Sequence, residues 1–186
     1  MPTIDGPDEE LLEGYTATGE LRWLDELFGR HMARVRNIVF PIVLHEADAD
    51  DITQEVFVRA ARGLARFRRT SQFSTWLHRI AVNTAVDFVR RRKRTPMCDG
   101  MDAVEDHPGN GVLPSGGLVT RETDHAIGAA LRELSPELRA AITLTAIEGL
   151  STTEAAAACN CLAATLYWRV HKARKILREK LGTHRS

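Results

Sequence analysis

Apolar residues recur every three or four positions in two separate blocks of the chain, which is the spacing of amphipathic α-helices. The stripes of the first block consist of Leu24, Phe28, Met32, Val35 and Val39; of Ile52, Val56, Phe57, Ala60, Leu64 and Phe67; and of Phe73, Trp76, Leu77, Ile80, Thr84 and Phe88. Pro41 is expected to end the first helix, because proline lacks the amide hydrogen that continues it. The second helix is expected to begin near Asp50 and Asp51, because acidic side chains favour the positive end of a helix. Helices that share apolar faces in this way form a bundle.

The second block, from Arg121 onward, predicts further helices with clear local signals. Pro136 suits the first turn of a helix and Gly149 suits its end. Ser151 and Glu154 have the spacing of a capping box, which opens a short alanine-rich helix. After the turn Cys159-Asn160-Cys161 comes a basic helix, whose apolar stripe consists of Leu162, Leu166, Val170, Ala173 and Leu177. A short helix, a tight turn and a longer basic helix predict a helix-turn-helix.

Between the two blocks, residues 97–120 hold many of the glycines and prolines and show no periodicity. This composition is typical of a flexible linker. The sequence therefore predicts an all-α protein of two small helical domains, residues 8–96 and 122–182, joined by a flexible linker at residues 97–121.

The net charge of the chain is zero, with 25 acidic and 25 Lys and Arg residues, but the charges are segregated. Residues 1–20 carry only acids, and a second acidic group lies between Asp48 and Glu55. Bases dominate residues 59–94 and the final helix. Separate acidic and basic blocks suggest different surfaces for different partners, with the basic blocks as nucleic-acid faces.

The final helix carries polar and aromatic groups on the positions that its apolar stripe leaves outward. These candidates for contact with a major groove are Tyr167, Trp168, Arg169, His171, Lys172 and Arg174. Two adjacent large aromatics do not both fit a narrow apolar stripe, so one of Tyr167 and Trp168 is expected to be exposed. A solvated basic face is the alternative, but the capping box and the turn favour DNA binding.

Several motifs resemble those of extracytoplasmic-function sigma factors of RNA polymerase. DDITQEVF at 50–57, FSTWLHRIAVNTAVD at 73–87 and Arg90-Arg91 are similar to region 2 of that family. ALRELSP at 130–136, EGLS at 148–151 with Glu154, and residues 165–174 are similar to region 4. The resemblance implies a promoter-recognition subunit that binds core RNA polymerase and promoter DNA, with an anti-sigma protein as its inhibitor.

The resemblance also implies roles for individual residues. It places polymerase docking at Asp50, Asp51, Gln54 and Glu55. Simple stabilisation of a helix start would explain the two aspartates but not the other two residues. It places minus-10 DNA contacts at Arg68, Arg69, Ser71, Asn83, Arg90 and Arg91, with an extruded base near Asn83. Trp76 lies on the apolar stripe, which favours a core role over base stacking.

The linker is long enough for the two domains to contact both promoter elements, because about 24 residues reach at most ~80 Å. A promoter spacer of about one and a half DNA turns spans roughly 55 Å. The turn Cys159-Asn160-Cys161 departs from the family pattern, and Asn160 is expected to adopt the left-handed conformation that glycine usually supplies there. Tyr167 and Trp168 also depart from the family pattern. The family pattern therefore does not give the minus-35 DNA sequence that this chain recognises.

The sequence shows no catalytic motif: it has no phosphate-binding loop, no metalloprotease motif and no evident nucleophile with a base. No cofactor and no metal are expected, and the two cysteines of the turn are too few for a metal site. Three cysteines, an acidic start and no long apolar stretch favour a cytoplasmic protein without membrane insertion, monomeric when free. An operator-binding homodimer is one alternative, but it would not need the motifs at 50–55 and 73–87. A sigma-mimicking adaptor is the other, but it is expected to have degraded basic and base-contacting positions and usually a receiver domain.

Overall fold

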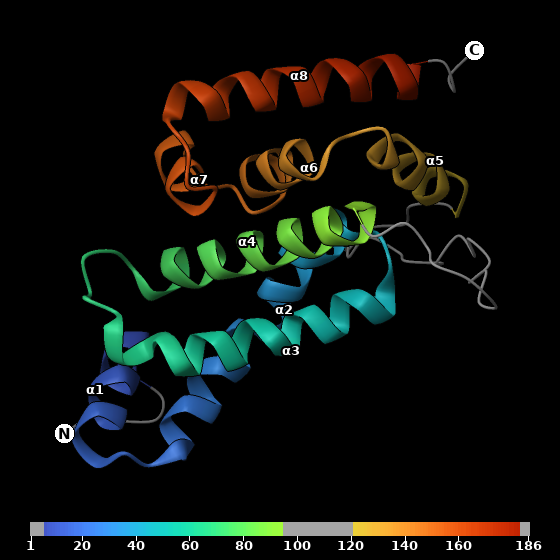
Figure 1. The fold of residues 1–186 in the computed structure, drawn as a ribbon. Helices are drawn as coiled ribbons and strands as arrows, with labels where there is room; N and C mark the ends of the chain where they lie inside the picture. The colour runs from blue at the N-terminus through green and yellow to red at the C-terminus, as the bar shows by residue number, and fades with distance from the viewer. Residues whose placement is uncertain (1–5, 95–120, 183–186) are drawn as a thin grey trace.

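The computed structural model describes residues 6–94 and 121–182, with side chains from residue 126 onward in the second range. All regular elements in these ranges are helical, and they form two bundles (Figure 1). The all-α fold with two helical domains is confirmed. Residues 97–120 of the predicted linker lie outside the described residues, and Arg121, its last residue, already belongs to a helix.

The first bundle is built around α2 (Leu21–Val43), which packs against α1 (Asp8–Thr18), α3 (Glu46–Gly63) and α4 (Phe73–Arg94). A short 3₁₀ turn, η1 (Leu64–Arg66), follows α3. Leu27, Val35 and Ile38 of α2 are fully buried in the centre. The apolar stripes predicted from the sequence therefore face a common core, with one exception: Met32 of the first stripe is 43% exposed.

Helix α1 is an addition to the predicted stripes. Gly14 lets the ring of Trp23 lie directly against α1, because a Cβ at this position would lie 2.6 Å from the ring. The indole nitrogen of Trp23 donates a hydrogen bond to Thr18 Oγ1 at 3.0 Å. This contact closes the N-terminal end of the bundle.

One predicted helix boundary is wrong, and the structure refines a second. Helix α2 continues through Pro41 to Val43 and ends at Leu44, whose φ is 64°. Proline removes one hydrogen bond of the last turn there, and the helix ends only with the left-handed residue. Helix α3 begins at Glu46, with His45 Nδ1 accepting from the Asp48 amide at 3.3 Å, so Asp50 and Asp51 lie in its second turn rather than at its start.

The second bundle consists of α5 (Arg121–Arg132), α6 (Pro136–Ile142), the π-helical turn η2 (Thr143–Ile147), α7 (Thr152–Ala158) and α8 (Ala163–Gly182). Pro136 occupies the first turn of α6 behind the N-cap Ser135, and Gly149 has a φ of 66° after η2. The capping box is confirmed: the Ser151 hydroxyl accepts from the Glu154 amide, and the Glu154 carboxylate accepts from the Ser151 amide at 2.9 Å. Asn160 has a φ of 49° in the turn between α7 and α8, as expected.

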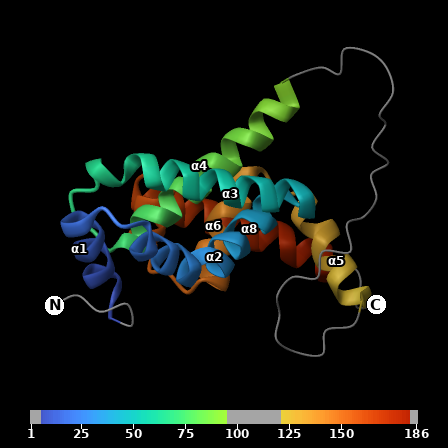
Figure 2. The ribbon, with the colours of Figure 1, turned by 90° about the horizontal axis from the view of Figure 1, so that it is seen from below.

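The two bundles pack against each other (Figures 1 and 2). Helix α6 lies against α2 and α4, and α7 lies against α4. One cluster of buried apolar residues runs from the first bundle into the second, where its members are Ala140, Ala141, Leu144, Ala155, Ala156, Ala158 and Leu166. Residues far apart in the sequence therefore meet in one core. No described helix is both long and apolar enough to cross a membrane.

Candidate nucleic-acid interface

The acidic face of α3 points away from the core. Asp51 and Gln54 are exposed, and Glu55 is partly exposed and accepts from Arg59 Nε at 2.9 Å. Asp50 is exposed and paired with Arg36 at 2.6 Å. Residues three and four apart share one side of a helix, so Asp51, Gln54 and Glu55 form one surface. The ion pairs of Asp50 and Glu55 are made with Arg36 and Arg59 of the first bundle.

The loop before α4 carries the first three candidate DNA contacts, Arg68, Arg69 and Ser71, all exposed. Arg69 has a φ of 54° and its guanidinium lies 3.2 Å from Glu13 of α1. Behind the loop Phe67, Phe73 and Trp76 pack as a cluster, with ring centroids 5.0 to 6.0 Å apart. Trp76 is half-buried in this cluster. The three rings together support the loop from behind.

The other candidate minus-10 residues lie further along α4. Asn83 is exposed but lines a cavity of about 80 Å³ whose opposite wall includes Glu137, Cys159 and Arg169 of the second bundle. Arg91 is exposed and its Nε donates to the Asp87 carbonyl at 3.3 Å. At a rise of about 1.5 Å per residue, Arg91 lies roughly 27 Å along the helix from Phe73. The loop and the arginine-rich end of α4 are thus two separate patches.

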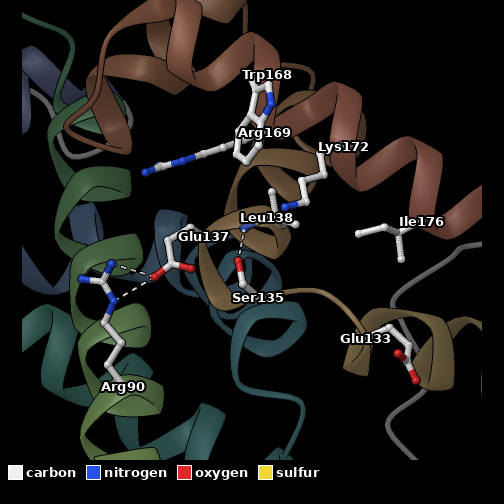
Figure 3. Close-up of a pocket in the computed structure, with 9 residues that line it drawn as sticks. All are labelled: Arg90, Glu133, Ser135, Glu137, Leu138, Trp168, Arg169, Lys172 and Ile176. Carbon is white, nitrogen blue, oxygen red and sulfur yellow. Dashed lines mark hydrogen bonds and ion pairs between the residues drawn. The ribbon is translucent and has the colours of Figure 1, made fainter.

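Arg90 is engaged by the second bundle. Its Nε and Nη2 lie 2.8 and 2.7 Å from one carboxylate oxygen of Glu137, at the start of α6 (Figure 3). Burial alone would raise the pKa of Glu137, but hydrogen bonds from its own backbone amide, from Ser135 and from Arg90 lower it overall. Glu137 is therefore a carboxylate at neutral pH, fully able to hold Arg90.

Helix α8 presents the predicted row of outward groups. Tyr167 and Trp168 are 70% and 55% exposed, so both adjacent aromatics lie outside the core. The Lys172 ammonium lies 4.8 Å from the centroid of the Trp168 ring, a cation–π contact that orients both side chains. His171, Lys172 and Arg174 are exposed, whereas Arg169 is half-buried.

A groove of about 430 Å³ runs between α8, α6 and the end of α4 (Figure 3). Trp168, Arg169 and Lys172 line it from α8, and Arg90 and Glu137 line it from the facing side. Arg90 of the predicted minus-10 surface and Arg169 and Lys172 of the predicted minus-35 surface therefore line the same groove.

The comparisons with known proteins match both halves of the chain. Sigma-70 region 2 matches residues 27–95, and Sigma-70 region 4 matches residues 124–177. The ECF RNA polymerase sigma factor SigE of Mycolicibacterium smegmatis is 34% identical over 175 residues, which cover 92% of this chain and 68% of that protein. The ECF RNA polymerase sigma-E factor of Escherichia coli is 32% identical over 180 residues, which cover 93% and 94%. The chain belongs to the ECF RNA polymerase sigma factors.

Solved structures agree with this assignment. CnrH, solved in complex with the cytosolic domain of CnrY, superposes with a TM-score of 0.68 at 26% identity, covering 95% of this chain and 99% of CnrH. The sigma factor RpoE of Bartonella quintana, solved with the anti-sigma factor NepR, shares the fold at 24% identity, with a TM-score of 0.66 and coverage of 89% and 100%. As an alternative sigma factor, the protein directs promoter recognition by RNA polymerase.

Both cysteines of the sigma factor's helix-turn-helix pack against the core. Burial raises the pKa of the Cys159 thiol to about 12, and the neighbouring Cys161 adds to the effect. A thiol with this pKa stays protonated and is a poor nucleophile and metal ligand. Among residues 6–94 and 126–182, no group of three or more His, Cys, Asp or Glu side chains could hold a metal ion.

Sequence reasoning missed the residues that join the two halves of the sigma factor. Arg34 of α2 donates from Nε to Glu148 at 2.7 Å, and Arg79 of α4 donates to Asn160 Oδ1 at 2.9 Å. His78 is fully buried on α4 beside them. Partners more than 80 positions apart leave no periodic signal in one sequence, so only the three-dimensional structure reveals them.

Proposed function

We propose that this sigma factor docks on core RNA polymerase through the surface of Asp50, Asp51, Gln54 and Glu55 on α3. An exposed row of carboxylates and an amide complements a basic partner and steers its approach. Asp50 and Asp51 lie in the second turn of α3, where the field of the helix end is weak, so helix stabilisation is a poor alternative explanation for them.

The first bundle opens and holds the minus-10 element. Arg68, Arg69 and Ser71 are placed to bind phosphates, and Asn83 offers both a donor and an acceptor to the edge of an extruded base. Arg90 and Arg91 contribute salt-dependent phosphate contacts at the far end of α4. The aromatic cluster of Phe67, Phe73 and Trp76 supports the loop from behind.

The second bundle reads the minus-35 element as duplex DNA through α8. The exposed face of this helix is the single observation that carries the proposal, because it combines two solvent-exposed aromatics with cations directly after a capped helix-turn-helix. Tyr167 and Trp168 contact base edges, whereas Arg169, His171, Lys172 and Arg174 contact phosphates or bases.

The protein works in the cytoplasm as a monomer until it meets polymerase, and it has no catalytic role of its own. An anti-sigma protein inhibits it, by analogy with the sigma factor RpoE, which was solved in complex with NepR. The two structural relatives cover 89% and 95% of this chain, and both were solved in complex with another protein.

The docking proposal is tested by competition for core polymerase against a labelled reference sigma factor. Replacing Asp51 and Glu55 together by lysine is expected to weaken binding at least about 100-fold, since like charges replace a complementary surface (about 2.7 kcal/mol). The matched control is Glu9→Lys with Asp25→Lys, which makes the same change in net charge at exposed sites on α1 and α2. Wild-type affinity of the α3 variant, with unchanged helix content, would refute docking through this face.

A further inference from the structure

Helix α1 is fixed on the first bundle at both of its ends. Near its start, Asp8 Oδ2 lies 2.7 Å from Nε2 of the buried His31 on α2. At its end, Thr18 Oγ1 accepts the hydrogen bond from the Trp23 indole at 3.0 Å. Between these two contacts, Leu11 is fully buried. A helix anchored in this way holds its exposed side chains in fixed places.

The minus-10 loop, which we define as residues 68–72, lies beside α1 (Figures 1 and 2). All of its residues are exposed, and Arg69 has a φ of 54°, in the left-handed region that is unfavourable for a residue with a Cβ. Among the backbone hydrogen bonds of the described residues, only one involves this loop, from the Trp76 amide to the Gln72 carbonyl. The backbone of the loop therefore does little to hold Arg69 in its conformation.

Glu13 of α1 is the side chain that reaches the minus-10 loop. Its Oε1 lies 3.2 Å from Nη1 of Arg69. Within the described part of the chain, this is the one polar contact that a side chain of the loop makes. A guanidinium has several N–H donors, so the pair leaves others of Arg69 available to a phosphate. Glu13 therefore orients Arg69 without occupying all of it.

The end of the minus-10 loop is connected to α1 through two rings. The loop is followed by Phe73, the buried first residue of α4. The rings of His31 and Phe73 pack edge to face with their centroids 5.3 Å apart, and His31 is the residue paired with Asp8. Helix α1 thus contacts the loop directly at Arg69, and through His31 the residue that follows it.

We propose that Glu13 is a positioning residue for minus-10 recognition: it holds Arg69, and with it the minus-10 loop, in the shape that receives the opened strand. This inference rests on the proposed role of Arg69 as a phosphate contact. The gain is preorganisation, since a loop fixed beforehand loses less conformational freedom when DNA binds. The Sigma-70 region 2 match begins at residue 27, so Glu13 lies outside the matched segment.

The sign of the effect separates this role from that of an ordinary surface acid. A carboxylate close to DNA repels the phosphates, so removal of a surface acid is expected to favour DNA binding. Removal of Glu13 is expected to do the opposite, because Arg69 then loses the contact that offsets its left-handed conformation.

The test measures promoter opening by holoenzyme reconstituted from core polymerase and the full chain. The template is a promoter identified by the 5′ end of a transcript that the wild-type holoenzyme makes, and permanganate detects unpaired thymines in its minus-10 element. Glu13→Gln keeps the size of the side chain and removes its charge. It is expected to slow opening about fivefold, the upper range for an exposed ion pair, with unchanged affinity for core polymerase.

Glu9→Gln is the matched control. Glu9 is exposed one turn before Glu13 on the same side of α1, so its substitution removes one negative charge from the same face. No polar contact between Glu9 and the minus-10 loop occurs in the described structure. The control is expected to open the promoter at least as fast as the wild type. Opening by Glu13→Gln at the wild-type rate or faster would overturn the proposal, and so would an equal loss in Glu9→Gln.

A double-mutant cycle shows whether Glu13 acts through Arg69. In the background Arg69→Gln, Glu13→Gln is expected to have no further effect, because the side chain that it positions is gone. An undiminished loss in this background would assign Glu13 to the stability of α1 and overturn the positioning role. Normal opening by Arg69→Gln alone would instead refute the proposed phosphate contact, so the two ideas fail in different ways.

The minus-10 loop is also observed directly in the free chain by NMR relaxation. The backbone order parameters of residues 69–71 are expected to fall in Glu13→Gln and to stay at the wild-type values in Glu9→Gln. Equal order parameters in all three proteins would overturn the preorganisation of the loop.

Discussion

The two bundles of this sigma factor bury their apolar residues in different ways. The first has large side chains such as Leu27, Ile38 and Leu77 at its centre. The second has a small core of its own, made of Leu131, Leu134, Leu138, Ile142 and Ala173. Its remaining buried apolar residues belong to the cluster that continues into the first bundle. The second bundle therefore has a smaller core of its own and shares much of its buried apolar surface with the first.

The largest expected effect tests this difference. Leu27→Ala removes a fully buried side chain from α2 and is expected to lower the free energy of unfolding by about 3–5 kcal/mol. Leu138→Ala in the small cluster is expected to cost about 2–3 kcal/mol, because fewer neighbours surround it. Urea denaturation followed by circular dichroism gives both values. A larger loss for Leu138→Ala would reverse the comparison.

The boundary between the bundles is expected to weaken in acid because of His78. Burial lowers the pKa of His78 to about 4, and the positive charges of Arg34 and His31 add to this, while Glu154 opposes it. The unfolded chain binds this proton from about pH 6.5 downward and the folded chain only near pH 4, so stability is full above pH 6.5 and falls toward pH 4. The loss from this group is about 3 kcal/mol.

The variant His78→Leu isolates that effect. It removes two buried nitrogens without partners and is expected to stabilise the protein by about 1–2 kcal/mol at pH 7. Its stability is also expected to fall less between pH 6.5 and pH 4 than that of the wild type. The same acid dependence in both proteins would assign the effect to other groups.

The smallest effect concerns the second bundle alone. Ser151→Ala removes the N-cap of α7 and is expected to lower stability by about 1 kcal/mol. Thr152→Ala, at the neighbouring exposed position, is the control and is expected to change stability by less than about 0.5 kcal/mol. Thermal melting of the two variants measures the difference. Equal melting temperatures would mean that the capping box adds nothing in this context.

Local signals in the sequence predicted most of the fold. The capping box of Ser151 and Glu154, the left-handed Asn160 and the apolar stripes of α2, α3, α4 and α8 all depend on neighbours in the chain. Helix α1 was missed because only Leu11 and Leu12 of its apolar residues are buried. The end of α2 was misplaced and the start of α3 was placed only approximately, because Pro41 and Asp50 are compatible with more than one position in a helix.

The candidate site was predicted in its composition but not in its arrangement. The exposure of Tyr167 and Trp168 follows from their adjacency on a helix with a narrow apolar stripe. The engagement of Arg90 by Glu137 does not follow from the sequence, since the pair joins residues 47 positions apart. The alanines of α7 indicated a helix, but their use as a contact surface for α4 depends on tertiary packing.

The central claim is that this chain directs RNA polymerase to promoters through separate surfaces on its two bundles. Core polymerase reconstituted with the purified chain on genomic DNA, followed by mapping of transcript 5′ ends, tests it most directly. The account predicts starts downstream of one shared pair of sequence elements, lost with Asp51→Lys and Glu55→Lys and less selective for the upstream element with Trp168→Ala. Start sites no different from those of core polymerase alone would contradict it.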